Sequence, residues 1–238
     1  MKKHLPNALT CLNLFCGCLA LVLVLRGGPG NQLVLATYLV GIAAVADFFD
    51  GLVARALGVS SPIGKDLDSL ADMVSFGVVP GAILYQLLER ALLGSANWPY
   101  LPFAAFILTV FSALRLAKFN NDSRQTDSFI GLPTPACTLV VAALPLILAH
   151  DRFGLTGLLL NPWFLLGLTA LLAGLLVAEL PLFALKFKNF GWADNRRRYV
   201  FILLALGLLL GLGAVGIPLA VLAYVAMSVP GKRGAVGG

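Results

Sequence analysis

The chain is dominated by a succession of apolar runs, each long enough to cross a lipid bilayer. A helix needs about 20 apolar residues to span the hydrocarbon core, with a usual range of about 17 to 25. The runs extend over Ala8 to Leu25, Leu33 to Ala56, Leu67 to Leu88, Leu101 to Phe119, Pro133 to Ala149, Pro162 to Leu185 and Tyr199 to Val229. We therefore predict a polytopic membrane protein.

The last run is too long for one ordinary span. Gly213, Gly216 and Pro218 lie in its middle and break helices, so we divide it into two helices joined by a tight turn. The expected fold is then an all-α membrane helix bundle of about eight spans with both termini on one side. We expect residues 1–229 to form a single transmembrane domain, with a disordered tail at 230–238.

The composition supports this class and excludes several others. The chain is 59% hydrophobic, and 12% of its residues are charged, against about 25% in soluble domains. The net charge of +6 could indicate nucleic-acid binding, but the basic residues lie in short loops between apolar runs. We expect no nucleic-acid partner. The four cysteines lie inside apolar runs and suggest neither a disulfide framework nor a zinc site.

Lysine and arginine are distributed unevenly over the two sides that eight spans would create. One side has Lys2, Lys3, Arg55, Lys65, Lys118, Arg124, Lys186, Lys188, Arg196, Arg197, Arg198, Lys232 and Arg233; the other has Arg26, Arg90 and Arg152. Loops rich in lysine and arginine remain in the cytoplasm. We predict a cell-membrane protein with both termini on the cytoplasmic side.

Aspartates gather where two of the spans end. Five of the eleven acidic residues fall between positions 47 and 72: Asp47, Asp50, Asp66, Asp68 and Asp72. Ionisable groups in membrane helices are costly and usually functional. The spacing puts Asp47 and Asp50 on one face of the second helix, and Asp68 and Asp72 on one face of the third. We expect Asp66 to point elsewhere, as the N-cap of the third helix.

The short segment 57–65 should join these two helices as an antiparallel hairpin, so the four remaining carboxylates would converge. They would repel one another unless cations lay between them, and oxygen ligands favour magnesium or manganese over zinc. Any one of these aspartates alone could be an interfacial residue solvated by headgroup water. Gly51 and Gly64 would let a ligand approach the backbone, and Arg55 offers a bidentate partner for phosphate.

The pattern Asp47-x2-Asp50-Gly51-x2-Ala54-Arg55-x8-Gly64-x3-Asp68-x3-Asp72 resembles the signature of the CDP-alcohol phosphotransferases at all eight marked positions. The resemblance implies a six-helix membrane core, here about residues 5–185, with two additional C-terminal helices. It also implies a homodimer and two divalent ions, Mg²⁺ or Mn²⁺, held by the four aspartates. Asp72 would be the general base, and Gly51, Ala54, Arg55 and Gly64 would bind the CDP group.

Segments outside the signature, such as Leu12 to Gly17, Leu67 to Gly77 and Gly131 to Pro135, resemble the phosphatidylserine synthase branch. This implies transfer of a phosphatidyl group from CDP-diacylglycerol, a membrane lipid, to L-serine at the cytoplasmic surface. Phosphatidylglycerophosphate synthesis is the alternative. A cation transporter is a rival from another class, but the aspartates lie at span ends and not at mid-membrane.

A zwitterionic acceptor such as serine needs one cation for its carboxylate, whereas glycerol 3-phosphate brings a dianion. Near the cytoplasmic end of the fourth span we find Arg115 and Lys118, followed by polar Asn120. We predict that these three residues bind the acceptor. Snorkelling to the interface would also explain Arg115 and Lys118. The resembling branch often has arginine at the position of Lys118, which argues against bidentate anion binding there.

Overall fold

A computed structural model describes residues 4–27, 31–59, 61–93, 98–121, 128–183 and 191–228. Five helical stretches within these ranges are long and apolar enough to cross a membrane: Leu5–Arg26, Gln32–Leu57, Pro62–Ala91, Leu101–Asn121 and Asn195–Ser228. Thr134–His150 and Pro162–Val177 are shorter apolar helices. The predicted all-α membrane bundle is confirmed. Whether each shorter helix crosses the bilayer stays a prediction.

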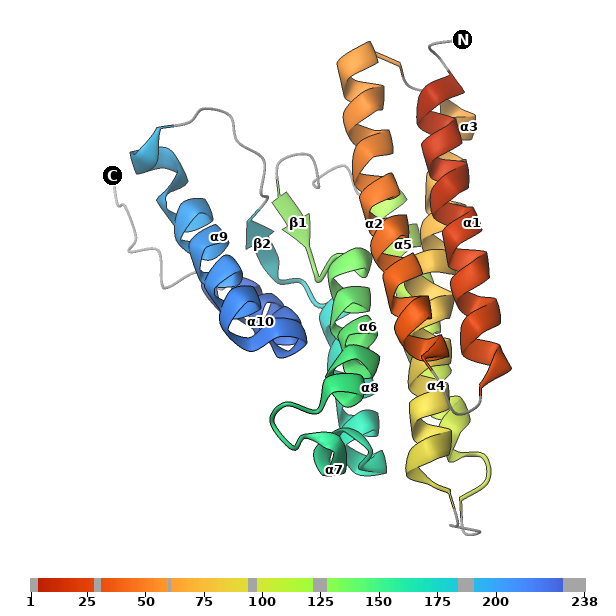
Figure 1. Ribbon diagram of the computed structural model, residues 1–238. Helices are drawn as coiled ribbons and strands as arrows, with labels where there is room; N and C mark the ends of the chain where they lie inside the picture. The colour runs from red at the N-terminus through yellow and green to blue at the C-terminus, as the bar shows by residue number, and fades with distance from the viewer. Residues whose placement is uncertain are drawn as a thin grey trace.

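The N-terminal half is a group of long helices packed side by side (Figure 1). Its helices are α1 (Leu5–Arg26), α2 (Gln32–Leu57), α3 (Pro62–Asp72), η2 (Met73–Val78) and α4 (Val79–Ala91). Helices α1 and α2 pack along their length, and α3 lies against α1 near the upper end in Figure 1. The end of α2 and the start of α3 therefore lie at the same end of the bundle.

Helix α3 begins earlier than the sequence suggested. Ser61 is its N-cap, and the Ser61 hydroxyl accepts a hydrogen bond from the Gly64 N–H at 3.0 Å. Pro62 occupies the first helical position, where a missing N–H is harmless. The prediction of Asp66 as the N-cap was wrong, because this serine and proline start the helix one turn sooner. The hairpin connection shortens to residues 58–61.

The third span is not a uniform α-helix. Residues Met73–Val78 form the π-helical segment η2, directly after Asp72. Pro80 follows and has no N–H to donate to the Phe76 carbonyl four residues earlier. The Thr138 hydroxyl lies 2.9 Å from that carbonyl and 2.9 Å from the Thr134 carbonyl of its own helix, and can donate to either. A side chain of another helix can thus compensate for a backbone donor that proline removes, as a membrane interior requires.

The remaining core helices are η3 (Leu101–Phe106), α5 (Ile107–Asn121), α6 (Thr134–His150), α7 (Thr156–Leu159) and α8 (Pro162–Val177). The sequence had suggested a helix from Pro162 to Leu185. That endpoint was wrong, because α8 stops at Val177 and the chain then turns extended through Ala178. Strand β2 (Pro181–Phe183) pairs antiparallel with β1 (Ser128–Ile130), a short ribbon the sequence did not predict.

The C-terminal helices α9 (Trp192–Leu212) and α10 (Gly216–Ser228) meet at the turn η4 (Gly213–Val215). This confirms the division of the last apolar run at its glycines. The two helices lie beside each other, apart from the N-terminal group (Figure 1). The Tyr224 hydroxyl of α10 donates a hydrogen bond to the Phe183 carbonyl at 2.8 Å. This contact connects α10 to strand β2.

Apolar side chains occupy both the interior and the outer surface of the bundle. The interior contains Val40, Ile83, Leu87, Leu108 and Val141, all buried. The exposed large apolar side chains include Phe15, Leu25, Phe48, Leu114 and Leu210. Extensive exposed apolar surface is a mark of a membrane-facing protein. The tail predicted at 230–238 lies outside the described residues.

Candidate active site

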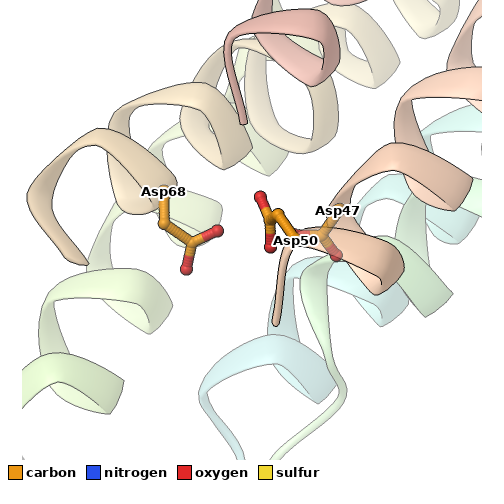
Figure 2. A group of neighbouring side chains, drawn as sticks. All are labelled: Asp47, Asp50 and Asp68. Carbon is orange, nitrogen blue, oxygen red and sulfur yellow. The ribbon is translucent and has the colours of Figure 1, made fainter. Parts of the chain in front are cut away.

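Three carboxylates converge where α2 ends and α3 begins. Asp47, Asp50 and Asp68 each have an oxygen atom within 4.8 Å of the others, and Figure 2 shows the side chains turned toward one another. Asp50 is only 6% exposed. Helices α2 and α3 are joined by residues 58–61 and both pack against α1, which brings their carboxylates together.

Asp72 adjoins this group one helical turn farther along α3. Its carboxyl lies beside the Asp47 carboxyl. The four predicted carboxylates are thus arranged as two levels. Asp50 and Asp68 lie nearer the helix ends, and Asp47 and Asp72 lie one turn deeper in the bundle.

Helix α1 holds both levels through two buried polar side chains. The Thr10 hydroxyl donates to Asp50 Oδ2 at 2.7 Å, and Asn13 Nδ2 donates to Asp72 Oδ1 at 3.3 Å. The backbone carbonyl of Asn13 accepts a hydrogen bond from the Ser75 hydroxyl at 3.0 Å, which connects α1 to η2. Sequence reasoning assigned no role to Thr10 or Asn13. Their spacing of three on an otherwise apolar helix was the available signal.

An open cavity of about 460 Å³ lies on the Asp50 and Asp68 side of the carboxylates. Its lining residues are Pro6, Asn7, Thr10, Asp50, Gly51, Ala54, Val59, Ser61, Gly64, Lys65 and Asp68. Three of the four residues predicted to bind the CDP group are among them.

The fourth of those residues, Arg55, lies beside the cavity. A Cβ atom on Gly51 would be 3.3 Å from an Arg55 guanidinium nitrogen, so the arginine folds back along the face that Gly51 leaves open. A positive group therefore stands next to a polar cavity whose wall lacks a side chain at this point. An anionic ligand could approach the backbone there.

The cluster has the chemistry of a divalent-cation site. Three carboxylates supply hard oxygen ligands from two helices, which suits magnesium, manganese or calcium better than zinc. The two-level arrangement also leaves Asp72 oriented by the Asn13 amide. The residues present therefore fit a metal-assisted reaction on a phosphate group.

Arg115 lies deep in the bundle, near Asp72. It is 7% exposed, and its guanidinium carbon is 5.0 Å from the centre of the Phe119 ring. It interacts electrostatically with Asp72. A buried arginine beside a carboxylate cluster balances part of its charge.

The other two predicted acceptor-binding residues make contacts elsewhere. Lys118 Nζ forms an ion pair with Glu179 Oε1 at 3.1 Å, and both side chains are exposed. The side-chain amide of Asn120 donates to the Ser69 hydroxyl at 2.7 Å, and the backbone carbonyl of Asn120 accepts from Lys65 Nζ at 3.1 Å. Asn120 thereby joins the end of α5 to α3. A role in acceptor binding stays a prediction for both residues.

A family model described as CDP-alcohol phosphatidyltransferase matches residues 3–177, a region that contains every residue of this site. The chain belongs to the CDP-alcohol phosphatidyltransferase family. The predicted membership is confirmed, and the matched region covers the bundle from α1 through α8.

Within the CDP-alcohol phosphatidyltransferases, the chain is similar to several curated enzymes that share one name. A CDP-diacylglycerol–serine O-phosphatidyltransferase of Bacillus subtilis (strain 168) is 31% identical over 67% of this chain and 88% of its own length. One from Helicobacter pylori (strain J99) is 32% identical over 85% of this chain and 80% of its own length. One from Methanocaldococcus jannaschii is 35% identical over 58% of each chain.

Proposed function

We propose that this chain transfers the phosphatidyl group of CDP-diacylglycerol to L-serine, giving phosphatidylserine and CMP. The observation that carries the proposal is the convergence of Asp47, Asp50 and Asp68 beside the cavity, with Asp72 adjoining them. Relatives that cover most of the chain carry the corresponding enzyme name.

The cavity is the expected site for the nucleotide part of the lipid. Gly51, Ala54 and Gly64 leave its wall open, and Arg55 stands beside it to pair with phosphate. Asp47, Asp50, Asp68 and Asp72 would hold two divalent ions, magnesium or manganese, which when bound neutralise charge on the pyrophosphate. The acyl chains would remain in the bilayer, because the site lies at the ends of membrane helices.

The chemical step is a displacement at the phosphorus that carries diacylglycerol. The serine hydroxyl oxygen forms the new P–O bond, and the bond to the bridging oxygen breaks as CMP leaves with its electron pair. Asp72 accepts the hydroxyl proton. The Asn13 amide donates to Asp72 Oδ1 and so orients this carboxylate.

For the arrangement in the membrane we keep the orientation that the sequence predicts. The active site and both termini would face the cytoplasm, where Arg55, Lys65 and Lys118 lie at helix ends. Arg26, Arg90 and Arg152 lie at the opposite ends. We propose that the functional unit is a homodimer. Its mass measured in detergent should then correspond to two chains.

The proposal is tested by measuring CMP release from CDP-diacylglycerol by purified protein in detergent micelles, with L-serine or glycerol 3-phosphate as acceptor. L-Serine should give the faster release. EDTA should abolish it, and excess Mg²⁺ or Mn²⁺ should restore it.

Faster release with glycerol 3-phosphate would identify the alternative, phosphatidylglycerophosphate synthesis. Release that persists in EDTA would contradict the assignment of the carboxylates to a metal site. An Asp66→Asn variant is a suitable control, because Asp66 is exposed and lies on the same helix outside the cluster.

A further inference from the structure

Three buried polar atoms have no hydrogen-bond partner in the part of the chain that the structure describes. They are Asn13 Oδ1 of α1, Arg115 Nε of α5 and Thr134 Oγ1 of α6. The exposed fractions of these residues are 0%, 7% and 0%. Buried polar groups nearly always have partners, so these three atoms are available to a bound ligand.

Contacts between the helices place the three residues at the level of Asp72. Asn13 donates to the Asp72 carboxylate from α1, and Arg115 interacts with it electrostatically from α5. In α5, Arg115 lies between Ser112, which faces Gly77, and Asn120, which donates to Ser69. Gly77 and Ser69 lie on either side of Asp72 in the sequence, so Arg115 is level with that part of the third span.

Thr138 of α6 contacts the Phe76 carbonyl, and α6 runs in the same direction as α3 and η2 (Figure 1). Thr134 lies one helical turn before Thr138, as Asp72 lies one turn before Phe76, so Thr134 is level with Asp72.

This region is separate from the cavity assigned to the nucleotide. Asp50 and Asp68 line that cavity, whereas Asp72, Asn13, Arg115 and Thr134 do not. In a displacement at phosphorus the attacking and leaving oxygens lie roughly in line on opposite sides. If CMP leaves toward the cavity, the acceptor must approach from the side of Asp72.

The surroundings of Asp72 contain one part that favours an anion and another that accepts hydrogen bonds from a cation. Arg115 and the first turn of the 17-residue helix α6, where Thr134 lies, both favour an anion. Asn13 Oδ1 can only accept a hydrogen bond, and it lies beside Asp72. The amide orientation is determined by that contact, because Nδ2 and not Oδ1 must face a carboxylate.

We propose that Asn13, Arg115 and Thr134 form the subsite for the acceptor, and that this subsite selects a small zwitterionic amino acid. Arg115 and the Thr134 hydroxyl donate to the carboxylate of the acceptor, and Asn13 Oδ1 accepts from its ammonium group. The acceptor hydroxyl then faces Asp72. This inference rests on the proposed function, to which it adds the origin of acceptor selectivity.

The test compares L-serine with serinol, in which a second hydroxymethyl group replaces the carboxylate. CMP release is measured with CDP-diacylglycerol and MgCl₂ for wild type, Arg115→Gln and Thr134→Val. For L-serine, kcat/KM should fall about tenfold or more in both variants, because each loses a charge-assisted contact. For serinol it should change less than about threefold, and the KM for CDP-diacylglycerol should stay constant.

Two controls separate binding from folding. Thr134→Ser keeps the hydroxyl and should retain the preference for L-serine. Thr169→Val removes a buried hydroxyl that donates only within α8, to the Leu165 carbonyl, and should leave both acceptors unaffected. An equal fall for L-serine and serinol in Arg115→Gln and Thr134→Val would overturn the inference.

Thermal unfolding provides a readout that does not depend on turnover. L-Serine should raise the Tm of the wild type and of Thr134→Ser, and should raise it less in Thr134→Val. If no CMP is released but these shifts occur, the proposed function fails and the subsite stands. If L-serine shifts no Tm while turnover is normal, the inference fails and the proposed function stands. If Arg115→Gln shows no cooperative unfolding, Thr134→Val decides.

Discussion

Asp72 differs from the other aspartates of the site in its surroundings. Asp47, Asp50 and Asp68 face one another, whereas Asp72 adjoins Asp47, accepts from Asn13 and lies near Arg115. Carboxylates of one sequence motif therefore have different environments. We propose that all four bind cations and that Asp72 also accepts the proton of the incoming hydroxyl group.

At this scale we predict that Asp72→Asn abolishes turnover in a protein that remains folded. Asparagine keeps the shape of the side chain and removes both its charge and its basicity. Loss of a general base lowers kcat by about 10² to 10⁴-fold. The measurement is kcat for CMP release, with Asp66→Asn as the matched control. Retention of more than about a tenth of wild-type kcat would show that Asp72 is not the base.

The helical elements contribute to the site through their irregularities. The third span changes from α3 to the π-helix η2 directly after Asp72, and Pro80 leaves the Phe76 carbonyl without its usual donor. Thr138 of α6 supplies a hydroxyl to that carbonyl. The position of η2 behind the carboxylates thus depends on a hydrogen bond from a helix distant in sequence.

We predict that Thr138→Val lowers stability, because a buried carbonyl loses its partner while the side-chain volume stays nearly constant. Leaving such a group unsatisfied costs about 1 to 3 kcal/mol. The free energy of unfolding is measured with denaturant in mixed micelles. Thr169→Val is the control, since the Thr169 hydroxyl donates only within its own helix. Equal destabilisation of the two variants would show that the Thr138–Phe76 contact adds no more stability than a hydroxyl bonded within its own helix.

Over the whole molecule, charge is separated along the helix axes. Arg55 near the end of α2, Lys65 in α3 and Lys118 near the end of α5 lie at the same end of the bundle as the carboxylate cluster. Arg26 and Arg90 lie in the last turns of α1 and α4, and Arg152 follows the end of α6. These are the lower ends of the three helices in Figure 1. This separation is the basis for placing the site on the cytoplasmic surface.

The orientation is tested with single cysteines introduced into a cysteine-free background. Asp66→Cys near the site should be protected from an impermeant thiol reagent in intact cells and should react after the membrane is permeabilised. Arg152→Cys at the other end should react in intact cells. Both positions are exposed in the structure, so burial does not explain a difference. Labelling of Asp66→Cys from outside would invert the topology.

The sequence by itself determined the class of the fold and most of the carboxylate site. Apolar runs predict membrane helices because the required length is fixed by the bilayer. The spacings of Asp47 and Asp50, and of Asp68 and Asp72, determine a helix face because 3.6 residues complete a turn. The short connection at residues 58–61 keeps the end of α2 and the start of α3 at the same end of the bundle. Each of these steps depends on residues close to one another in the chain.

Only the tertiary structure decided which other side chains meet these carboxylates. Thr10 and Asn13 reach Asp50 and Asp72 because α1 packs against α2 and α3, and Thr138 reaches η2 because α6 does. Lys118 pairs with Glu179 across distant segments. Helix periodicity gives the direction of a side chain relative to its own axis, but not which neighbouring helix it faces. That choice depends on the packing of the whole bundle.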